Sequence, residues 1–293
     1  MADILDAVFR RHGHPTSASS EDKSVLSHST TECDGSSVVV IGKRGVCSAL
    51  LFLTAVTAAS ELGHKVIFYT HTVIQKFPVP VQESMTSLKP DSLKKIKFVY
   101  PRSLEELLLD VASLHELGSS AAAAPSLVLV DGLDSYLHGM DGVGRAGAGG
   151  PQREEMSATA HLAALLIDTS SFLTRISEKT GDSRCIVKGP AVQCRIIVSY
   201  HSDWEAVTTD PKLSVLDRYF PTRCTLVQEL RSMAARDESQ HEWQVYLSGA
   251  GVSGGTANGQ QWHLGVRANG AMEFSRTSKS KEPGDSDQQR EGV

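Results

Sequence analysis

The fold is decided by the stretch Val38-Val39-Val40-Ile41-Gly42-Lys43-Arg44-Gly45-Val46-Cys47-Ser48, which leads into an apolar segment from Ala49 to Leu62. The unbroken apolar run at its start predicts a strand that is buried on both faces. The glycines predict a turn, and the segment after them predicts a buried helix. Gly63 marks the expected end of that helix, and Val66 to Tyr69 form a second apolar run. Together these features predict the opening of a βαβ unit.

The same alternation continues along the chain. Further strands are expected over Ile96–Tyr100, Leu127–Val130 and Arg195–Tyr200, and helices over Leu104–Leu114 and Leu162–Ile176. Apolar strands that alternate with helices predict an α/β fold with a mostly parallel sheet flanked by helices. After Pro221 the spacing changes to that of a C-terminal antiparallel β meander. Its expected strands are Cys224–Val227, Trp243–Leu247, Trp262–Val266 and Met272–Phe274.

Length and composition indicate one folded domain with two polar ends. The chain has 293 residues, of which 40% are apolar and 22% charged, which suits a single sizeable core. We expect a disordered N-terminal extension over residues 1–35, a core over 36–274 and a disordered tail over 275–293. The extension contains a short amphipathic segment with Ile4, Leu5, Val8 and Phe9. This segment either docks on a partner or packs on its own domain.

Several classes of protein are disfavoured by the sequence. No stretch reaches the roughly 20 consecutive apolar residues of a membrane helix, and the start lacks the apolar core of a signal peptide. The five cysteines are odd in number and form no Cys-x-x-Cys pair, as expected for reduced thiols in cytosol or nucleus. The net charge of −5 gives no overall positive field, so any contact with DNA must come from local patches.

The first glycine turn matches part of a phosphate-binding signature. That signature, G-x-x-x-x-G-K-[ST], lies between a strand and a helix, where free backbone N–H groups and the helix dipole bind phosphate. Here Val46 and Cys47 stand where Gly and Lys are expected, and the first glycine is one residue too close to Ser48. The alternative is a plain turn with Ser48 as an ordinary helix cap. The candidate cofactor-binding residues are Gly42, Lys43, Arg44, Gly45, Val46, Cys47 and Ser48.

A candidate magnesium site is formed by Ser48 and Asp131. The Ser48 hydroxyl has the position of a magnesium ligand in the signature, and Asp131 follows the apolar strand Leu127–Val130, where a second ligand is expected. An aspartate after a strand also commonly opens a turn.

Four segments carry a resemblance to a known family, in matching order and spacing. The segments are Leu93–Pro101, Pro125–Leu137, Leu162–Thr169 and Leu216–Pro221. On these segments the chain resembles the ATPase associated with the SWIM-domain recombination protein, a divergent relative of RecA and the eukaryotic strand-exchange recombinases. The likeness runs from about Val38 to Phe274.

The resemblance implies a RecA-like P-loop core that binds ATP and Mg²⁺ and an ATPase activity favoured by single-stranded DNA. It also implies DNA binding, a complex with the SWIM-domain protein, support of the recombinase and its paralogues, and a nuclear location. One departure bears on hydrolysis, because the family's loop ends in Gly-Lys-Thr and this chain has Val46-Cys47-Ser48. The alternative is therefore a non-hydrolysing scaffold subunit. A small-molecule nucleotide kinase would need a complete loop and an Arg-rich lid, and neither is visible.

Further site residues follow from the resemblance. His71 stands near the position of the glutamate that orients the attacking water, and His201 near that of the γ-phosphate sensor, although either histidine could simply lie at the surface. The two DNA-holding loops of the superfamily correspond to about Ser202–Leu213 and His138–Glu155. They offer the candidate DNA-binding residues Arg145, Arg153 and Trp204.

Overall fold

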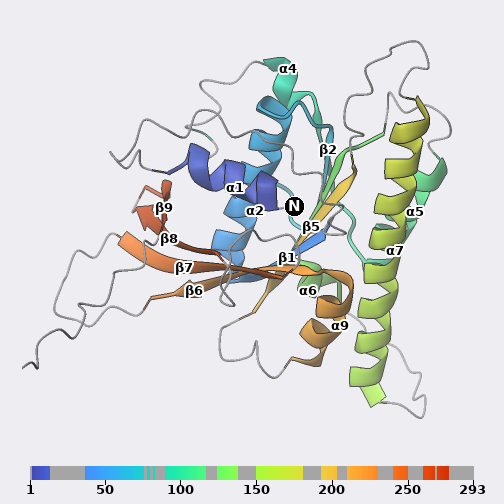
Figure 1. Ribbon diagram of the computed structural model, residues 1–293. Coiled ribbons are helices and arrows are strands. Elements are labelled where there is room, and N and C mark those ends of the chain that lie inside the picture. The colour runs from blue at the N-terminus through green and yellow to red at the C-terminus, as the bar shows by residue number, and fades with distance from the viewer. Residues whose placement is uncertain are drawn as a thin grey trace, which may run out of the picture.

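The described part of the chain forms one mixed sheet with helices on both faces (Figure 1). The computed structural model describes residues 2–13, 37–75, 78–79, 82, 90–116, 124–137, 150–180, 193–202, 210–229, 240–249, 260–267 and 269–276. The strand order is β3-β2-β4-β5-β1-β6-β7-β8-β9. The strands are β1 (Ser37–Gly42), β2 (Val66–Thr70), β3 (Ile96–Val99), β4 (Leu127–Asp131), β5 (Arg195–His201), β6 (Thr222–Gln228), β7 (Gln240–Gly249), β8 (Gln260–Arg267) and β9 (Met272–Arg276). The helices are α1 (Ala2–Arg11), α2 (Arg44–Ser60), α4 (Pro90–Leu93), α5 (Leu104–Ser113), η1 (Leu114–Glu116), α6 (Leu133–Leu137), α7 (Gly150–Thr180) and α9 (Pro211–Tyr219).

The sheet has a parallel and an antiparallel half, as the sequence predicts. β1 pairs in parallel with both β5 and β6, and β2 pairs in parallel with β3 and β4. β6 then pairs antiparallel with β7, so it joins the parallel half to the meander of β7, β8 and β9. The apolar strands β1, β2 and β4 are buried along their whole length, which follows from helices covering both faces. The predicted fold class is confirmed.

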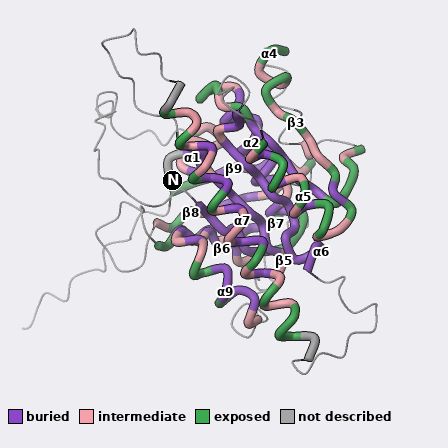
Figure 2. The backbone as a smooth tube through the Cα atoms, turned by 90° about the vertical axis from the view of Figure 1, so that its right-hand side faces the viewer, coloured by how far each residue is buried: buried purple, intermediate pink, exposed green. Residues whose placement is uncertain are grey.

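Two hydrophobic clusters lie on opposite faces of the sheet. One contains α1 and α2 and the inner face of the meander, and the other contains α5, α6, α7 and α9. Alternate residues of β1 take part in each, with Val38 and Val40 in the first and Val39 and Ile41 in the second. In Figure 2 the buried residues accordingly run through the sheet, and the exposed ones lie on the outer helix faces.

The amphipathic segment at the N-terminus packs on its own domain. Ile4, Leu5, Val8 and Phe9 of α1 are fully buried in the first cluster. The Phe9 ring lies 4.7 Å from that of Phe274, measured between centroids, and α1 therefore belongs to the folded core. The expected extension over 1–35 is corrected for residues 2–13. Residues 14–36 and 277–293 lie outside the described residues, and β9 extends the core to Arg276.

The connection between β1 and α2 is shorter than the expected glycine turn. β1 ends at Gly42 and α2 begins at Arg44, so Lys43 alone joins them. A Cβ atom at Gly42 would lie 3.0 Å from the backbone oxygen of Leu226, so the glycine permits the close approach of β1 and β6. Gly45 lies in the first turn of α2 rather than in a loop. The helix begins this early because Val46 and Cys47 are buried apolar side chains of its inner face.

Candidate functional site

Ser48 and Asp131 meet at the carboxyl edge of the parallel strands. Asp131 is the last residue of β4, and Ser48 lies one turn into the helix that follows β1. Because the carboxyl ends of parallel strands share one edge, the two side chains come together there. The Ser48 hydroxyl donates to the Asp131 carboxylate, with its Oγ 2.9 Å from Oδ1 and 3.0 Å from Oδ2. The structure thus brings the two predicted magnesium ligands together.

Asp131 is the centre of a larger polar group, here called the edge cluster. Ser199 donates to Asp131 Oδ1 over 2.9 Å, and Thr70 donates to Oδ2 over 3.4 Å. Both partners come from the neighbouring strands β5 and β2. Such hydrogen bonds are the usual means of holding a carboxylate that is only 9% exposed. The edge cluster consists of Ser48, Thr70, Asp131, Asp134, Ser199 and His201.

His201 lies between two carboxylates of the edge cluster. Its Nδ1 is 3.1 Å from Asp134 Oδ1, and its Nε2 is 3.7 Å from Asp131 Oδ1. Burial lowers the pKa of His201, but the nearby Asp131 and Asp134 carboxylates raise it above the ordinary value. The imidazole packs against Gly132, which has a φ of 73° and where a Cβ atom would lie 2.8 Å from His201 Cε1. The two carboxylates therefore favour the protonated imidazole, which makes His201 their charge partner more than a free base.

Asp134 is a site residue that the sequence analysis missed. Burial raises the pKa of its carboxyl group, but hydrogen bonds and charge from His201, and the charge of Arg44, lower it overall. Its Oδ1 accepts from the backbone N–H of His201 over 2.9 Å, and its Oδ2 lies 3.6 Å from Arg44 Nη2. Its position three residues after Asp131, at the start of α6, was the available signal.

Lys43 and Arg44, the two cations near the start of α2, each interact with other side chains of this protein. Lys43 donates to Gln228 over 2.7 Å and lies 5.9 Å from the centroid of the Trp243 ring. Arg44 donates to Ser135 over 2.9 Å beside its ion pair with Asp134. Cys47, which stands where the signature has lysine, is fully buried. Burial and the nearby Cys224, Asp131 and Asp134 raise the pKa of its thiol, so Cys47 supplies no positive charge and no thiolate.

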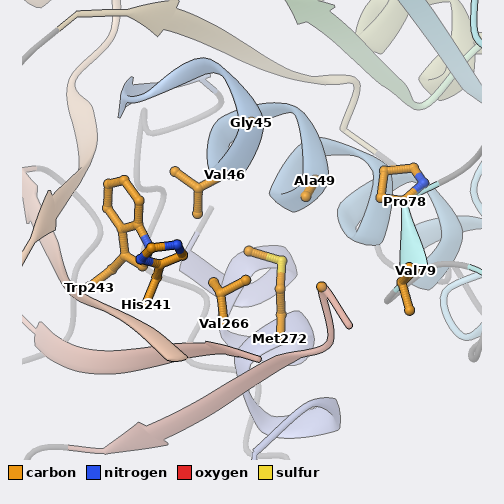
Figure 3. Close-up of a pocket in the computed structure, with 10 residues that line it drawn as sticks. Gly45, Val46, Ala49, Pro78, Val79, His241, Trp243, Val266 and Met272 are labelled. Atoms are coloured by element: carbon orange, nitrogen blue, oxygen red, sulfur yellow. The ribbon is translucent and has the colours of Figure 1, made fainter. Parts of the chain in front are cut away.

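An apolar cavity of about 310 Å³ lies beside the first turn of α2 (Figure 3). Val46 and Ala49 line it from the helix, and Trp243, Val266 and Met272 line it from the meander. A polyphosphate needs many hydrogen-bond donors and positive charge, whereas this lining is mostly apolar, with ring N–H groups on His241 and Trp243 as its side-chain donors. The cavity therefore does not replace the missing phosphate loop.

The residues of this site suit Mg²⁺ better than they suit ATP. A serine hydroxyl and a carboxylate at hydrogen-bond distance are suitable Mg²⁺ ligands. The backbone N–H groups that begin α2 receive no cap from the Lys43 side chain, so one element of a phosphate site is present. The wrapping loop and the lysine ammonium are absent from this turn, because Lys43 alone connects the strand to the helix. The residues suit the metal, and they do not suit a bound triphosphate.

The remaining predicted residues lie apart from the edge cluster or outside the described residues. His71 follows β2, is exposed, and places its ring 5.8 Å from that of Tyr136. Arg153 is an exposed residue of α7, which begins at Gly150, so the end of the expected loop His138–Glu155 is helical. Similarly, α9 begins at Pro211 within the expected loop Ser202–Leu213. Arg145 and Trp204 lie outside the described residues.

Comparison with known proteins identifies the family. The chain is 33% identical over 227 residues to human ATPase SWSAP1, and the match covers 77% of this chain and 82% of the human protein. The chain belongs to the SWSAP1 ATPase family. It is 34% identical over 183 residues to mouse ATPase SWSAP1, which covers 62% of this chain and about half, 55%, of the mouse protein. No family model matches the chain. The resemblance drawn from the sequence is confirmed.

The SWSAP1 assignment agrees with the likeness of the fold to a solved structure. A KaiC-like protein from the archaeon Pyrococcus horikoshii superposes with a TM-score of 0.51 at 12% identity, covering 82% of this chain and 89% of that one. At this identity the likeness concerns the fold alone. Within the described ranges, none of the helices combines the length and the apolar character that crossing a bilayer requires.

Proposed function

We propose that this SWSAP1 family member acts in homologous recombination as a RecA-like accessory subunit that works by binding its partners and not by hydrolysing ATP. The observation that carries the proposal is the β1–α2 connection, where a single residue replaces a phosphate loop and a buried neutral Cys47 replaces its lysine. The lysine and the loop amides of a P-loop stabilise the charge that moves during phosphoryl transfer. Without the lysine and the loop amides, this turn has no group that stabilises the charge that moves during ATP hydrolysis.

The internal charges of the edge cluster favour the same proposal. Asp131 and Asp134 raise the pKa of the neighbouring His201, and Asp134 also pairs with Arg44, so these carboxylates have charge partners within the chain. An edge with its own counter-charges holds α6, β4, β5 and the start of α2 in place without a nucleotide. The fold then serves as a rigid body that presents surfaces to other proteins.

The proposed partners are the SWIM-domain recombination protein and the strand-exchange recombinase with its paralogues, acting in the nucleus. This part of the proposal rests on the family. Binding of single-stranded DNA is proposed on the same ground, with Arg145, Arg153 and Trp204 as candidate contacts.

The proposal is tested by ATP hydrolysis of the purified full chain with Mg²⁺, with and without single-stranded DNA. The matched control is Asp131→Asn, which keeps the size of the side chain and removes its negative charge. We expect equal release of phosphate from both proteins, at the level of the buffer blank. DNA-stimulated hydrolysis that the unaltered chain shows and Asp131→Asn lacks would instead establish an ATPase.

A second measurement tests partner binding directly. The chain and a SWIM-domain partner are co-expressed and purified through a tag on the partner, with Mg²⁺-ATP or with EDTA. We expect equal recovery of the chain under both conditions, because the proposed binding needs no nucleotide. Recovery that requires Mg²⁺-ATP would contradict the proposal.

A further inference from the structure

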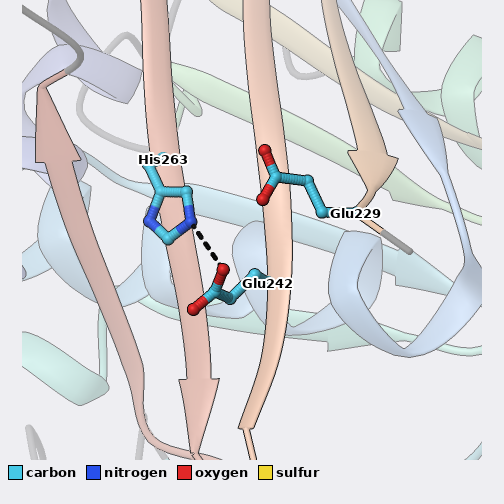
Figure 4. A group of neighbouring side chains, drawn as sticks. All are labelled: Glu229, Glu242 and His263. Atoms are coloured by element: carbon cyan, nitrogen blue, oxygen red, sulfur yellow. Dashed lines mark ion pairs between the residues drawn. The ribbon is translucent and has the colours of Figure 1, made fainter. Parts of the chain in front are cut away.

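A second group of metal-ligating side chains lies on the meander, away from the edge cluster. Glu229 follows β6, Glu242 lies on β7 and His263 lies on β8, and Figure 4 shows the three side chains gathered at neighbouring strands. One ligand atom from each lies within 4.8 Å of those of the other two. We propose that these three residues bind a Zn²⁺ ion.

The strand register places the three side chains together. The Glu229 N–H donates to the Glu242 carbonyl over 2.9 Å, so these two residues stand opposite each other. Gln244 pairs with His263 and Glu242 pairs with Gly265, which places His263 on the diagonal from Glu242 on the same face.

The distances suit a shared ion. His263 Nε2 lies 3.4 Å from Glu242 Oε2, which is long for a hydrogen bond. Two ligands about 2.1 Å from a tetrahedral zinc ion lie about 3.4 Å apart. The separation already present is therefore that of two atoms bound to one ion. Glu229 offers its ligand atom within the same 4.8 Å limit.

The charges favour a cation. Two carboxylates on directly opposite residues repel each other, and the Glu242 side chain is only 8% exposed, so water screens this repulsion weakly. A dication between the carboxylates turns the repulsion into attraction. Gln244 also fixes the Glu229 carboxylate by donating its amide N–H to Oε1, and Gln261 donates to Gln244 over 3.1 Å.

The kinds of ligand atom select zinc. One imidazole nitrogen with two carboxylate oxygens suits Zn²⁺, whereas Mg²⁺ prefers oxygen ligands alone. Three protein ligands leave the fourth tetrahedral position to water or to a ligand atom of another molecule. Because Glu229 and His263 are only partly buried, solvent can reach that fourth position. The ion would join β6, β7 and β8 at one point.

The proposal is tested by competition for Zn²⁺ between the full chain and a chromophoric chelator. We expect one equivalent of Zn²⁺ to bind to the unaltered chain, and the affinity to fall by more than about tenfold in Glu242→Gln and in His263→Gln. The matched control is His241→Gln, because His241 lies on the same strand but lines the cavity on the other face. This control is expected to bind Zn²⁺ as the unaltered chain does. Equal affinity in all four proteins would mean an adventitious ion only and would overturn the proposal.

A measurement on the unaltered chain keeps the test independent of the folding of the variants. X-ray absorption at the zinc edge is expected to show one imidazole, oxygen ligands for the rest and no sulfur. Sulfur, or more than one imidazole, would place the ion elsewhere and overturn the proposal. In addition, Zn²⁺ is expected to raise the melting temperature of the chain.

Discussion

At the scale of single residues, His201 makes the stability of the protein depend on pH. The Asp131 and Asp134 carboxylates raise the pKa of its imidazole above 6.5, even though burial alone lowers it. A raised pKa means that the contribution to the free energy of unfolding is fully present below about pH 6.5 and is lost as the pH rises through the folded-state value. The difference in unfolding free energy between the unaltered chain and His201→Gln should therefore be largest near pH 6 and shrink toward pH 8.5.

This prediction is checked by urea unfolding at several pH values in EDTA, over a range in which the carboxylates stay ionised. The exposed His71→Gln serves as the control for replacing a histidine by glutamine. A His201→Gln difference that grows as the pH rises would show that the imidazole is neutral in the folded protein.

Some residues of the edge cluster follow from the sequence and others do not. Asp131 is predictable because it comes directly after an apolar run, and Ser48 because of its place in the partial phosphate-binding signature, while parallel strands align their carboxyl ends. His201 and Ser199 are two residues apart on β5, so they share a face. By contrast, the contacts of Asp134 with His201 and Arg44 join three separate segments, and no local spacing in the sequence encodes them.

At the scale of elements, the packing of α1 predicts a large loss of stability on truncation of Phe9. Its ring stacks on Phe274, with centroids 4.7 Å apart, and lies 5.4 Å from Trp262. Phe9→Ala removes a fully buried aromatic ring and leaves a cavity, which should cost about 3–5 kcal/mol of unfolding free energy in urea. The control Arg10→Ala breaks an exposed ion pair with Asp6 and should change stability by less than about 1 kcal/mol. Similar small losses for both variants would show that α1 detaches readily.

The sequence predicts the existence of elements better than their ends. The apolar stripe of α1 is visible in the sequence, but such a stripe can bind a partner as well as the chain's own sheet. Only the packing in the structure shows that α1 binds its own sheet. The helix after β1 was also visible, and its start at Arg44 was not, because Gly45 normally indicates a turn. Here the burial of Val46 and Cys47 outweighs the unfavourable helix propensity of glycine, which is only about 1 kcal/mol.

At the scale of the whole molecule, the continuous sheet predicts that both halves unfold together. β6 pairs with β1 on one side and with β7 on the other, and the cluster around α2 contains residues of both halves, including Phe68, Trp243 and Trp262. Trp243 and Trp262 lie on the meander, so in a Trp204→Phe variant the fluorescence reports on that half. Circular dichroism of the helices reports mostly on the parallel half. The two urea midpoints should coincide, because unfolding of the meander would expose the apolar face of α2 to water. An earlier fluorescence midpoint would mean that the meander is a separate folding unit, joined to the parallel half by strand pairing alone.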